Sequence, residues 1–241
     1  MNHISELAQL GTSTWLDDLS RERLVSGNLE EIISTKSIVG VTTNPAIFAA
    51  AMTNGTAYDA ELSTLKEAKA SADEAVYALA IEDVKNACDL FADIYSSTNG
   101  ADGRVSIEVD PRISDDANAT LEQARELWSK VDRPNVMIKI PATTASLPAI
   151  EDALAEGISV NVTLIFSVDR YRDVIEAFRT GLKRAAEAGK DVSTIHSVAS
   201  FFVSRLDTEV DKRLEAIGSE IALALRGKAG VHNAQRAYAL F

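Results

Sequence analysis

A lysine stands inside an apolar, strand-like stretch, and this position points to chemistry. The stretch reads NVMIKIPAT from Asn135 to Thr143, with Lys139 near its C-terminal end. A single strand lysine is most often a solvated edge residue. A buried ammonium is costly without polar partners, and burial favours the neutral amine. A neutral amine in a water-poor pocket attacks carbonyl groups to form a Schiff base, and the protonated imine promotes carbon–carbon cleavage.

Polar residues at matching places in other strand-like runs supply the partners that this lysine needs. Glu108, Asn161 and Thr163 lie at a depth comparable to that of Lys139 within their runs and on the same polar face. Asp17 ends the first run and Asn44 follows the second. A carboxylate close to an imine can move the proton that bond cleavage requires.

The elements that must position these residues are short strands alternating with long amphipathic helices. The expected strands are Ser13–Asp17, Ile38–Thr43, Arg104–Asp110, Asn135–Ile140, Ile158–Thr163 and Thr194–Ser200. The helical patterns between and after them include Asp73–Ser97, Ser114–Val131, Val168–Ala188 and Val203–Leu225. Ser71, Ser114 and Ser167 are the expected helix caps. This alternation predicts parallel βαβ units, and the lack of a Gly/Pro-rich linker predicts one domain over residues 1–241.

The strands are apolar on one face and polar on the other, which decides between two α/β architectures. Along Arg104–Asp110 the apolar residues are Val105, Ile107 and Val109, and the polar ones alternate with them. An open doubly wound sheet carries helices on both faces and needs apolar strands throughout. A (β/α)₈ barrel of the TIM type explains the pattern, because late inward residues open into its C-terminal mouth.

Composition restricts the partners and the compartment. The 241 residues are 46% hydrophobic and 25% charged, as in an ordinary globular protein. A formal net charge of −12 disfavours nucleic acid and anionic membranes as partners. Cys88 is the single cysteine and lies on the apolar side of a helical pattern, which is typical of a small buried hydrophobe. The first residues lack signal-peptide features, so the expected location is the cytoplasm.

Five motifs together resemble the transaldolase family. They are TTNPAIF at 42–48, VSIEVDPR at 105–112, IKIPAT at 138–143, ISVNVTLIFS at 158–167 and VASFFVSRLD at 198–207. The resemblance runs over essentially the whole chain and implies a (β/α)₈ barrel of the pentose phosphate pathway. It implies transfer of a dihydroxyacetone unit from sedoheptulose 7-phosphate or fructose 6-phosphate to an aldose phosphate such as glyceraldehyde 3-phosphate. It implies no metal and no organic cofactor.

The resemblance also assigns roles to individual residues. Lys139 would be the Schiff-base lysine, and Asp17, preferred to Asp18 for its parity, would shuttle the aldol proton. Glu108 and Thr163 would hold the water used in making and breaking the imine. The remaining residues would bind substrate, with Asn44 and Asn161 on the hydroxyls, Ser200 and Arg205 on the phosphate, and Phe202 lining the site.

Plainer roles remain open for several of these residues. Asn44 before Pro45 suits a turn and helix cap, and Ser200 suits a cap for a helix beginning near Phe202. Arg205 suits an exposed helix surface. His196, on the inward side of its strand, is taken as a core histidine and left out of the site.

Alternative functions also remain open. One is a cleaving enzyme like the fructose-6-phosphate aldolases, although Glu108 favours the transferase. A metal-dependent aldolase is disfavoured, because the three histidines are scattered. The third alternative is an inactive fragment: six βα units are expected where the barrel needs eight, and no further basic residue for the phosphate matches the family.

An incomplete barrel has consequences for its edges. We expect the first and sixth strands to be open edges and the apolar layer around Trp15, Val39 and Val198 to be partly exposed. The oligomeric state stays open, a homo-oligomer included.

Overall fold

The computed structural model describes residues 3–53 and 56–241, which divide into two compact units. The first unit takes the chain up to residue 111 together with residues 122–139, and the second takes residues 112–121 and 140–241. Helix α8 and strand β4 each run through a point of division. The expectation of one domain over residues 1–241 stays a prediction.

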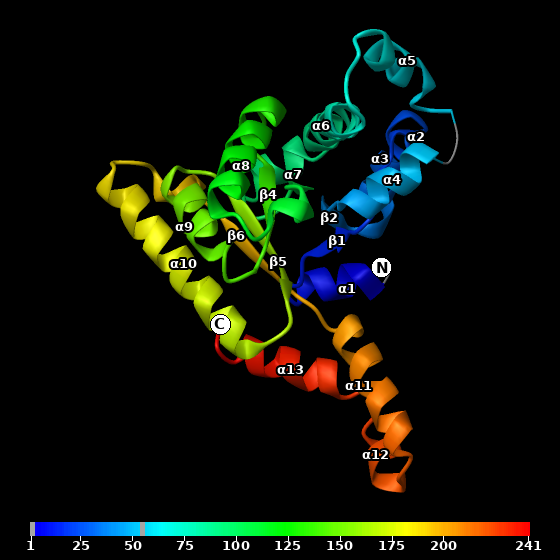
Figure 1. The fold of residues 1–241 in the computed structure, drawn as a ribbon, viewed down its shortest axis with the longest axis vertical. Coiled ribbons are helices and arrows are strands. Elements are labelled where there is room, and N and C mark those ends of the chain that lie inside the picture. Colours follow the sequence, from blue (N-terminus) through cyan, green and yellow to red (C-terminus); the bar gives the residue numbers. More distant parts are fainter. Residues whose placement is uncertain (1–2, 54–55) are drawn as a thin grey trace. The chain divides into compact units, whose positions relative to one another are not determined.

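The first unit contains three complete strands and most of a fourth (Figure 1). Its elements are α1 His3–Gln9, β1 Thr14–Leu16, α2 Arg21–Val25, α3 Asn28–Lys36, β2 Ile38–Val41, α4 Pro45–Thr53, α5 Asp59–Glu67, α6 Ala72–Leu90, α7 Ala92–Ser97, β3 Arg104–Glu108, and the larger parts of α8 Ala117–Val131 and β4 Val136–Pro141. Helix α6 packs against β3 and also contacts α2, α4 and α5. Every residue of β3 and β4 is buried, so these two strands form the centre of the unit.

The second unit continues the same alternation of strand and helix. Its elements are α9 Leu147–Ala155, β5 Val160–Ile165, α10 Val168–Glu187, a 3₁₀ turn Val192–Thr194, β6 Ser197–Phe201, α11 Ser204–Ile217, α12 Glu220–Ala224 and α13 Ala229–Tyr238. Helices α9 and α10 lie side by side, and α13 contacts both α10 and α11 (Figure 1). Strand β6 is half-buried along its whole length.

The strands follow chain order in the sheet, β1-β2-β3-β4-β5-β6. The pairs β1–β2, β2–β3, β3–β4 and β5–β6 are all parallel. Six parallel strands with helices between them confirm the expected α/β fold of the TIM-barrel type, with six βα units among the described residues. Strands β1 and β6 stand at the two ends of this order, as expected.

The last two strands begin later than the sequence pattern predicts. Ile158 was expected in a strand, but its backbone N–H donates to the carbonyl of Ala153 at 2.9 Å and closes the end of α9. Gly157 makes this turn possible with a φ of 87°, a conformation that favours glycine. Thr194 belongs to the 3₁₀ turn, in which the Asp191 carboxylate accepts a hydrogen bond from the Ser193 N–H. Strands β5 and β6 therefore begin only at Val160 and Ser197.

Two of the three expected helix caps are confirmed. Ser71 and Glu74 form a capping box at the start of α6, and the Ser167 hydroxyl accepts from the Arg170 N–H at the start of α10. The prediction for Ser114 is wrong, because α8 begins at Ala117 and the Asp116 carboxylate accepts from the Ala119 N–H at 3.0 Å.

Two of the long helical patterns are interrupted. The pattern over residues 73–97 breaks at Phe91, a fully buried residue between α6 and α7. The pattern over residues 203–225 breaks at Gly218, where a φ of 68° ends α11. Apolar periodicity continues through both breaks, so it did not reveal them.

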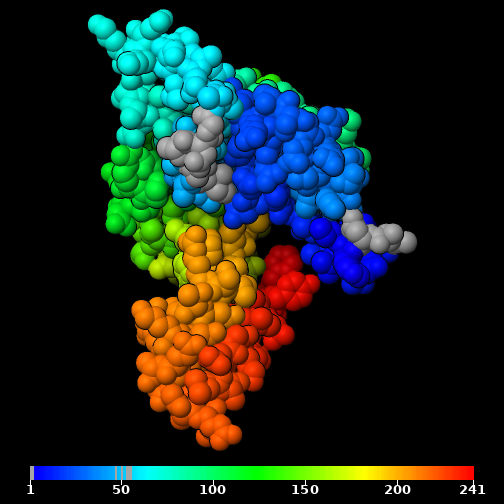
Figure 2. Space-filling view, turned by 90° about the vertical axis from the view of Figure 1, so that its right-hand side faces the viewer, coloured from blue at the N-terminus to red at the C-terminus, as the bar shows by residue number. Residues whose placement is uncertain are grey.

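Exposed apolar side chains gather on the last three helices. The orange and red surface in Figure 2 belongs to α11, α12 and α13. Ile217, Ile221 and Tyr238 are exposed there. Elsewhere Trp15, Val39 and Val198 are each half-buried, in line with the expected partial exposure. Among the described residues, no helix combines the length and apolar character that crossing a membrane requires.

Candidate active site

Lys139 of β4 faces Glu108 of β3 inside the first unit. The two residues are direct partners in the parallel register, so their side chains leave the sheet on the same face. The Lys139 Nζ atom lies 3.2 Å from Glu108 Oε2, and the two residues are 7% and 8% exposed. The expectation that they share one depth and one face is confirmed. A buried amine beside a carboxylate can exchange protons with it, as imine chemistry requires.

A second acceptor also contacts the lysine. Nζ donates to the backbone carbonyl of Thr43 at 3.0 Å. Thr43 follows β2 and is fully buried, and its own hydroxyl donates to the Ser106 carbonyl of β3 at 2.7 Å. Sequence reasoning chose the neighbouring Asn44 and missed this residue, because Thr43 contacts the lysine through its backbone carbonyl and not through its side chain.

The other two candidates of the first unit flank their strands. Asp17 follows β1 and is exposed, whereas its neighbour Asp18 is held by Arg23 at 2.6 Å. The ion pair of Asp18 with Arg23 agrees with the preference for Asp17, whose catalytic role stays a prediction. Asn44 is half-buried and directly precedes Pro45, the first residue of α4. This is the turn position that the plainer role for Asn44 requires.

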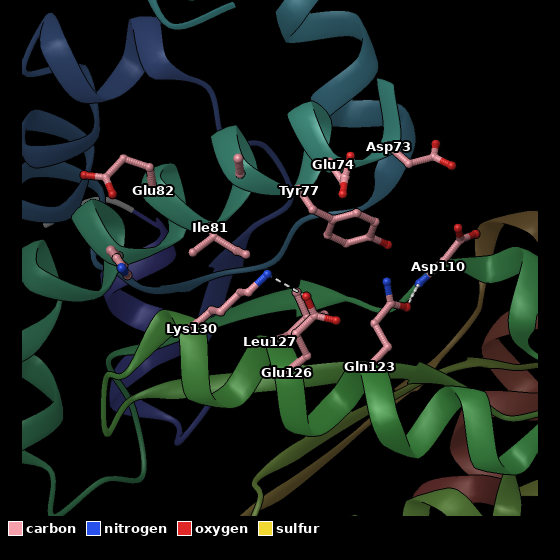
Figure 3. A pocket seen from close by; sticks show the side chains of 12 residues that line it. Asp73, Glu74, Tyr77, Ile81, Glu82, Asp110, Gln123, Glu126, Leu127 and Lys130 are labelled. Atoms are coloured by element: carbon pink, nitrogen blue, oxygen red, sulfur yellow. Dashed lines mark hydrogen bonds and ion pairs between the residues drawn. The ribbon is translucent and has the colours of Figure 1, made fainter. Parts of the chain in front are cut away.

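Two helices hold the end of β3 that carries Glu108. The Tyr77 hydroxyl of α6 donates to the Glu108 backbone carbonyl at 3.4 Å, and the Asp110 N–H donates to Gln123 Oε1 of α8 at 2.6 Å. Figure 3 shows both side chains in the wall of a groove between these helices, a cavity of about 530 Å³. These anchors were also missed, because surface-helix tyrosines and glutamines carry no distinctive pattern.

The second unit brings together Asn161 of β5 and Ser200 of β6. The Ser200 hydroxyl donates to Asn161 Oδ1 at 2.8 Å, and Asn161 is 1% exposed. Ser200 lies within β6, so the alternative that it caps a helix is wrong. Thr163 is equally buried, and its hydroxyl oxygen has no hydrogen-bond partner among the described residues. Buried hydroxyl groups normally have partners, so this oxygen is suited to holding a water molecule.

A bulge after Thr163 changes the alternation of β5. The register shifts between Val162 and Ile165, and Leu164 adopts a φ of 60°. Ile165 then pairs with Phe201 and is fully buried, while Leu164 is exposed. The bulge thus gives Ile165 the buried place beside Val162 that strict alternation would give to Leu164, one residue earlier in the chain.

Phe202 and Arg205 lie just beyond β6 and form a small stack. The Arg205 guanidinium carbon is 4.7 Å from the centre of the Phe202 ring, which stacks on Phe166 at 5.1 Å. Arg205 lies in the first turn of α11 and is exposed. A guanidinium in this position can donate N–H hydrogen bonds to an anion.

Two buried groups lie outside this chemistry. Burial raises the pKa of Cys88, which is 1% exposed, and this confirms that it is a buried hydrophobe. Arg104, at the start of β3, donates to the Gly100 carbonyl at 2.7 Å and lies over the Tyr95 ring, while burial lowers its pKa. Within the described part of the chain, no three His, Cys, Asp or Glu side chains converge as metal ligands.

Comparison with known proteins identifies the family. The family model described as Transaldolase/Fructose-6-phosphate aldolase matches residues 14–241. A protein named Transaldolase from Mycolicibacterium smegmatis is 61% identical over 239 residues, which are 99% of this chain and 64% of that protein. Transaldolases from Mycobacterium ulcerans and Kocuria rhizophila are 60% and 59% identical over 99% and 98% of this chain, each with 64% of its own length covered. The chain thus spans 64% of the length of these curated relatives, and it belongs to the transaldolase/fructose-6-phosphate aldolase family.

Proposed function

We propose that the protein carrying this chain is a transaldolase. It transfers a dihydroxyacetone unit from sedoheptulose 7-phosphate or fructose 6-phosphate to an aldose phosphate such as glyceraldehyde 3-phosphate. The observation that carries the proposal is the buried contact of 3.2 Å between Lys139 Nζ and the Glu108 carboxylate. Its relatives at about 60% identity, which bear the name Transaldolase, support the same reaction.

In this proposal Lys139 is the nucleophile that forms the imine with the ketose. Asp17 takes the hydroxyl proton during carbon–carbon cleavage and returns it during transfer. Glu108 and Thr163 hold the water that is released and later consumed. The Thr163 hydroxyl has no hydrogen-bond partner within the described part of the chain, which supports this role. Asn44 and Asn161 bind hydroxyl groups of the three-carbon unit.

Phosphate recognition falls to Ser200 and Arg205, with Phe202 lining the site. The stack of Arg205 on Phe202 supports this assignment, because the ring orients the planar guanidinium, whose N–H groups match the geometry of phosphate oxygens. The net charge of −12 makes such a local cation necessary for an anionic substrate. We place the enzyme in the cytoplasm, since the buried, unpaired Cys88 suits a reducing compartment.

Covalent trapping tests the proposal. Borohydride reduction of the complete protein with fructose 6-phosphate is expected to add a reduced dihydroxyacetone unit to the peptide that contains Lys139, as measured by mass spectrometry. A Lys139→Met variant is expected to give no adduct, and Lys130→Met, which removes a helix-surface lysine paired with Glu126, to give the normal one. An adduct on another lysine, or none in the wild type, would contradict the assignment.

A second measurement separates transfer from cleavage. Conversion of fructose 6-phosphate is expected to be much faster with erythrose 4-phosphate than without it, because the bound three-carbon unit needs an acceptor. Equal rates would indicate the cleaving fructose-6-phosphate aldolase instead.

A further inference from the structure

The turn after β2 reaches the reactive lysine through the backbone of Thr43. This residue is fully buried, and its carbonyl oxygen accepts a hydrogen bond from Lys139 Nζ at 3.0 Å. Glu108 Oε2 lies 3.2 Å from the same nitrogen. An ammonium or amine nitrogen can rotate freely about its last bond. Two acceptors at defined places remove that freedom and direct the remaining bonding position of the nitrogen.

The Thr43 side chain determines where its carbonyl points. The hydroxyl donates to the backbone carbonyl of Ser106 at 2.7 Å. Ser106 and Glu108 lie two residues apart on β3 and share one face of that strand. A single strand therefore holds both acceptors of Lys139, one as a side chain and the other through the Thr43 hydroxyl. Loss of that hydroxyl would release the turn and leave the Ser106 carbonyl without this donor.

We propose that Thr43 is a positioning residue for the Schiff-base nitrogen, an inference that rests on the proposed function. When Lys139 attacks the ketone, the carbonyl oxygen leaves as water with one hydrogen from the amine and one supplied by an acid. The nitrogen of the protonated imine keeps one hydrogen. The Thr43 carbonyl accepts that hydrogen throughout, so the Glu108 carboxylate is released from Nζ to handle the water. The Thr43 side chain acts only through the peptide that it orients.

Three substitutions at Thr43 test this role in the complete protein. Thr43→Val keeps the shape and removes the hydroxyl, and Thr43→Ala also leaves room for a water molecule. Thr43→Ser keeps the hydroxyl. Thr120→Val is the matched control, because Thr120 of α8 is also fully buried and donates its hydroxyl to a backbone carbonyl, that of Ile113 at 3.0 Å.

The rate of borohydride trapping on Lys139, kcat and KM are measured for each variant. Thr43→Val and Thr43→Ala are expected to slow trapping and kcat by about 10- to 100-fold with little change in KM, because misplacing a reacting atom costs rate of this order. Thr43→Ser is expected to restore most of the rate, and Thr120→Val to leave it unchanged.

Several results would overturn the inference. It fails if Thr43→Val and Thr43→Ala trap as fast as the control, or if Thr43→Ser is as slow as Thr43→Val. It also fails if the loss appears in KM alone. A wild-type protein that forms no adduct on Lys139 would contradict the proposed function itself. The wild type is therefore tested before the variants.

Discussion

Glu108 shows how much depends on one carboxylate. Its side chain is buried beside Lys139, and its backbone carbonyl is held by Tyr77. Glu108→Gln keeps the size and hydrogen-bonding capacity but loses the charge that polarises water in the proposed function. The expected result is a fall in kcat of about 10²- to 10⁴-fold, which is typical for loss of a general acid–base group.

Folding of the Glu108→Gln variant should survive, since the amide can still accept a hydrogen bond from Lys139. Circular dichroism and thermal unfolding measured next to the wild type check this. An unfolded variant would mean that Glu108 serves structure and not chemistry. Glu126→Gln is the matched control, because Glu126 pairs with Lys130 on the exposed surface of α8 and should leave kcat unchanged.

At the scale of elements, α6 depends on its first turn. Ser71 accepts from the Glu74 N–H, and the Glu74 carboxylate accepts from the Ser71 backbone N–H at 2.8 Å and its hydroxyl at 2.7 Å. Ser71→Ala is expected to lower the free energy of unfolding by about 1 kcal/mol, measured by urea denaturation. Ser63→Ala, an exposed serine inside α5, should change it by less than about 0.5 kcal/mol.

The same turn predicts a pH dependence. The hydrogen bonds from Ser71 lower the pKa of Glu74. A lowered pKa in the folded state means stabilisation that is present above the unfolded pKa and lost as pH falls through the folded pKa. The difference in unfolding free energy between the wild type and Glu74→Gln should therefore shrink in acid. A difference that stays constant with pH would show that the carboxylate charge is irrelevant to this helix start.

At the scale of the whole molecule, buried polar contacts join elements that are distant in sequence. Asp83 of α6 is fully buried and hydrogen-bonded to Arg21 of α2. It also accepts from the Tyr58 hydroxyl at 2.6 Å, and that hydroxyl in turn accepts from the Arg21 backbone N–H at 2.8 Å. This cluster joins three segments of the first unit, and one of them, α2, follows Asp17 closely in the chain.

Breaking this cluster should therefore cost much more than losing a surface ion pair. Asp83→Ala leaves the Arg21 charge largely buried without its main partner, and the expected loss is about 3–5 kcal/mol of unfolding free energy. Glu61→Gln removes the partly exposed partner of the same arginine and should cost less than about 1 kcal/mol. Urea denaturation measures both, and similar losses for the two variants would contradict the central place of Asp83.

Sequence alone determined the fold class and the pairing at the heart of the candidate site. Alternation along β3 and β4 placed Glu108 and Lys139 on one face at one depth, and their register and contact agree with this. The period of a strand is two residues, so parity and distance from the strand end suffice to predict such a pair. The sequence also predicted the helix caps Ser71 and Ser167, because their hydroxyl groups accept hydrogen bonds from N–H groups only three residues away.

Tertiary structure alone decided which backbone groups complete the site. The Thr43 carbonyl contacts Lys139, which lies 96 residues away in the sequence. Every residue has a backbone carbonyl, so the residue type cannot predict which carbonyl makes this contact. Gly157 delayed the start of β5, the bulge at Leu164 altered its faces, and Gly218 divided a continuous apolar pattern. Each of these events depends on a backbone angle and on packing between distant segments, whereas sequence periodicity reports only which side chains prefer to be buried.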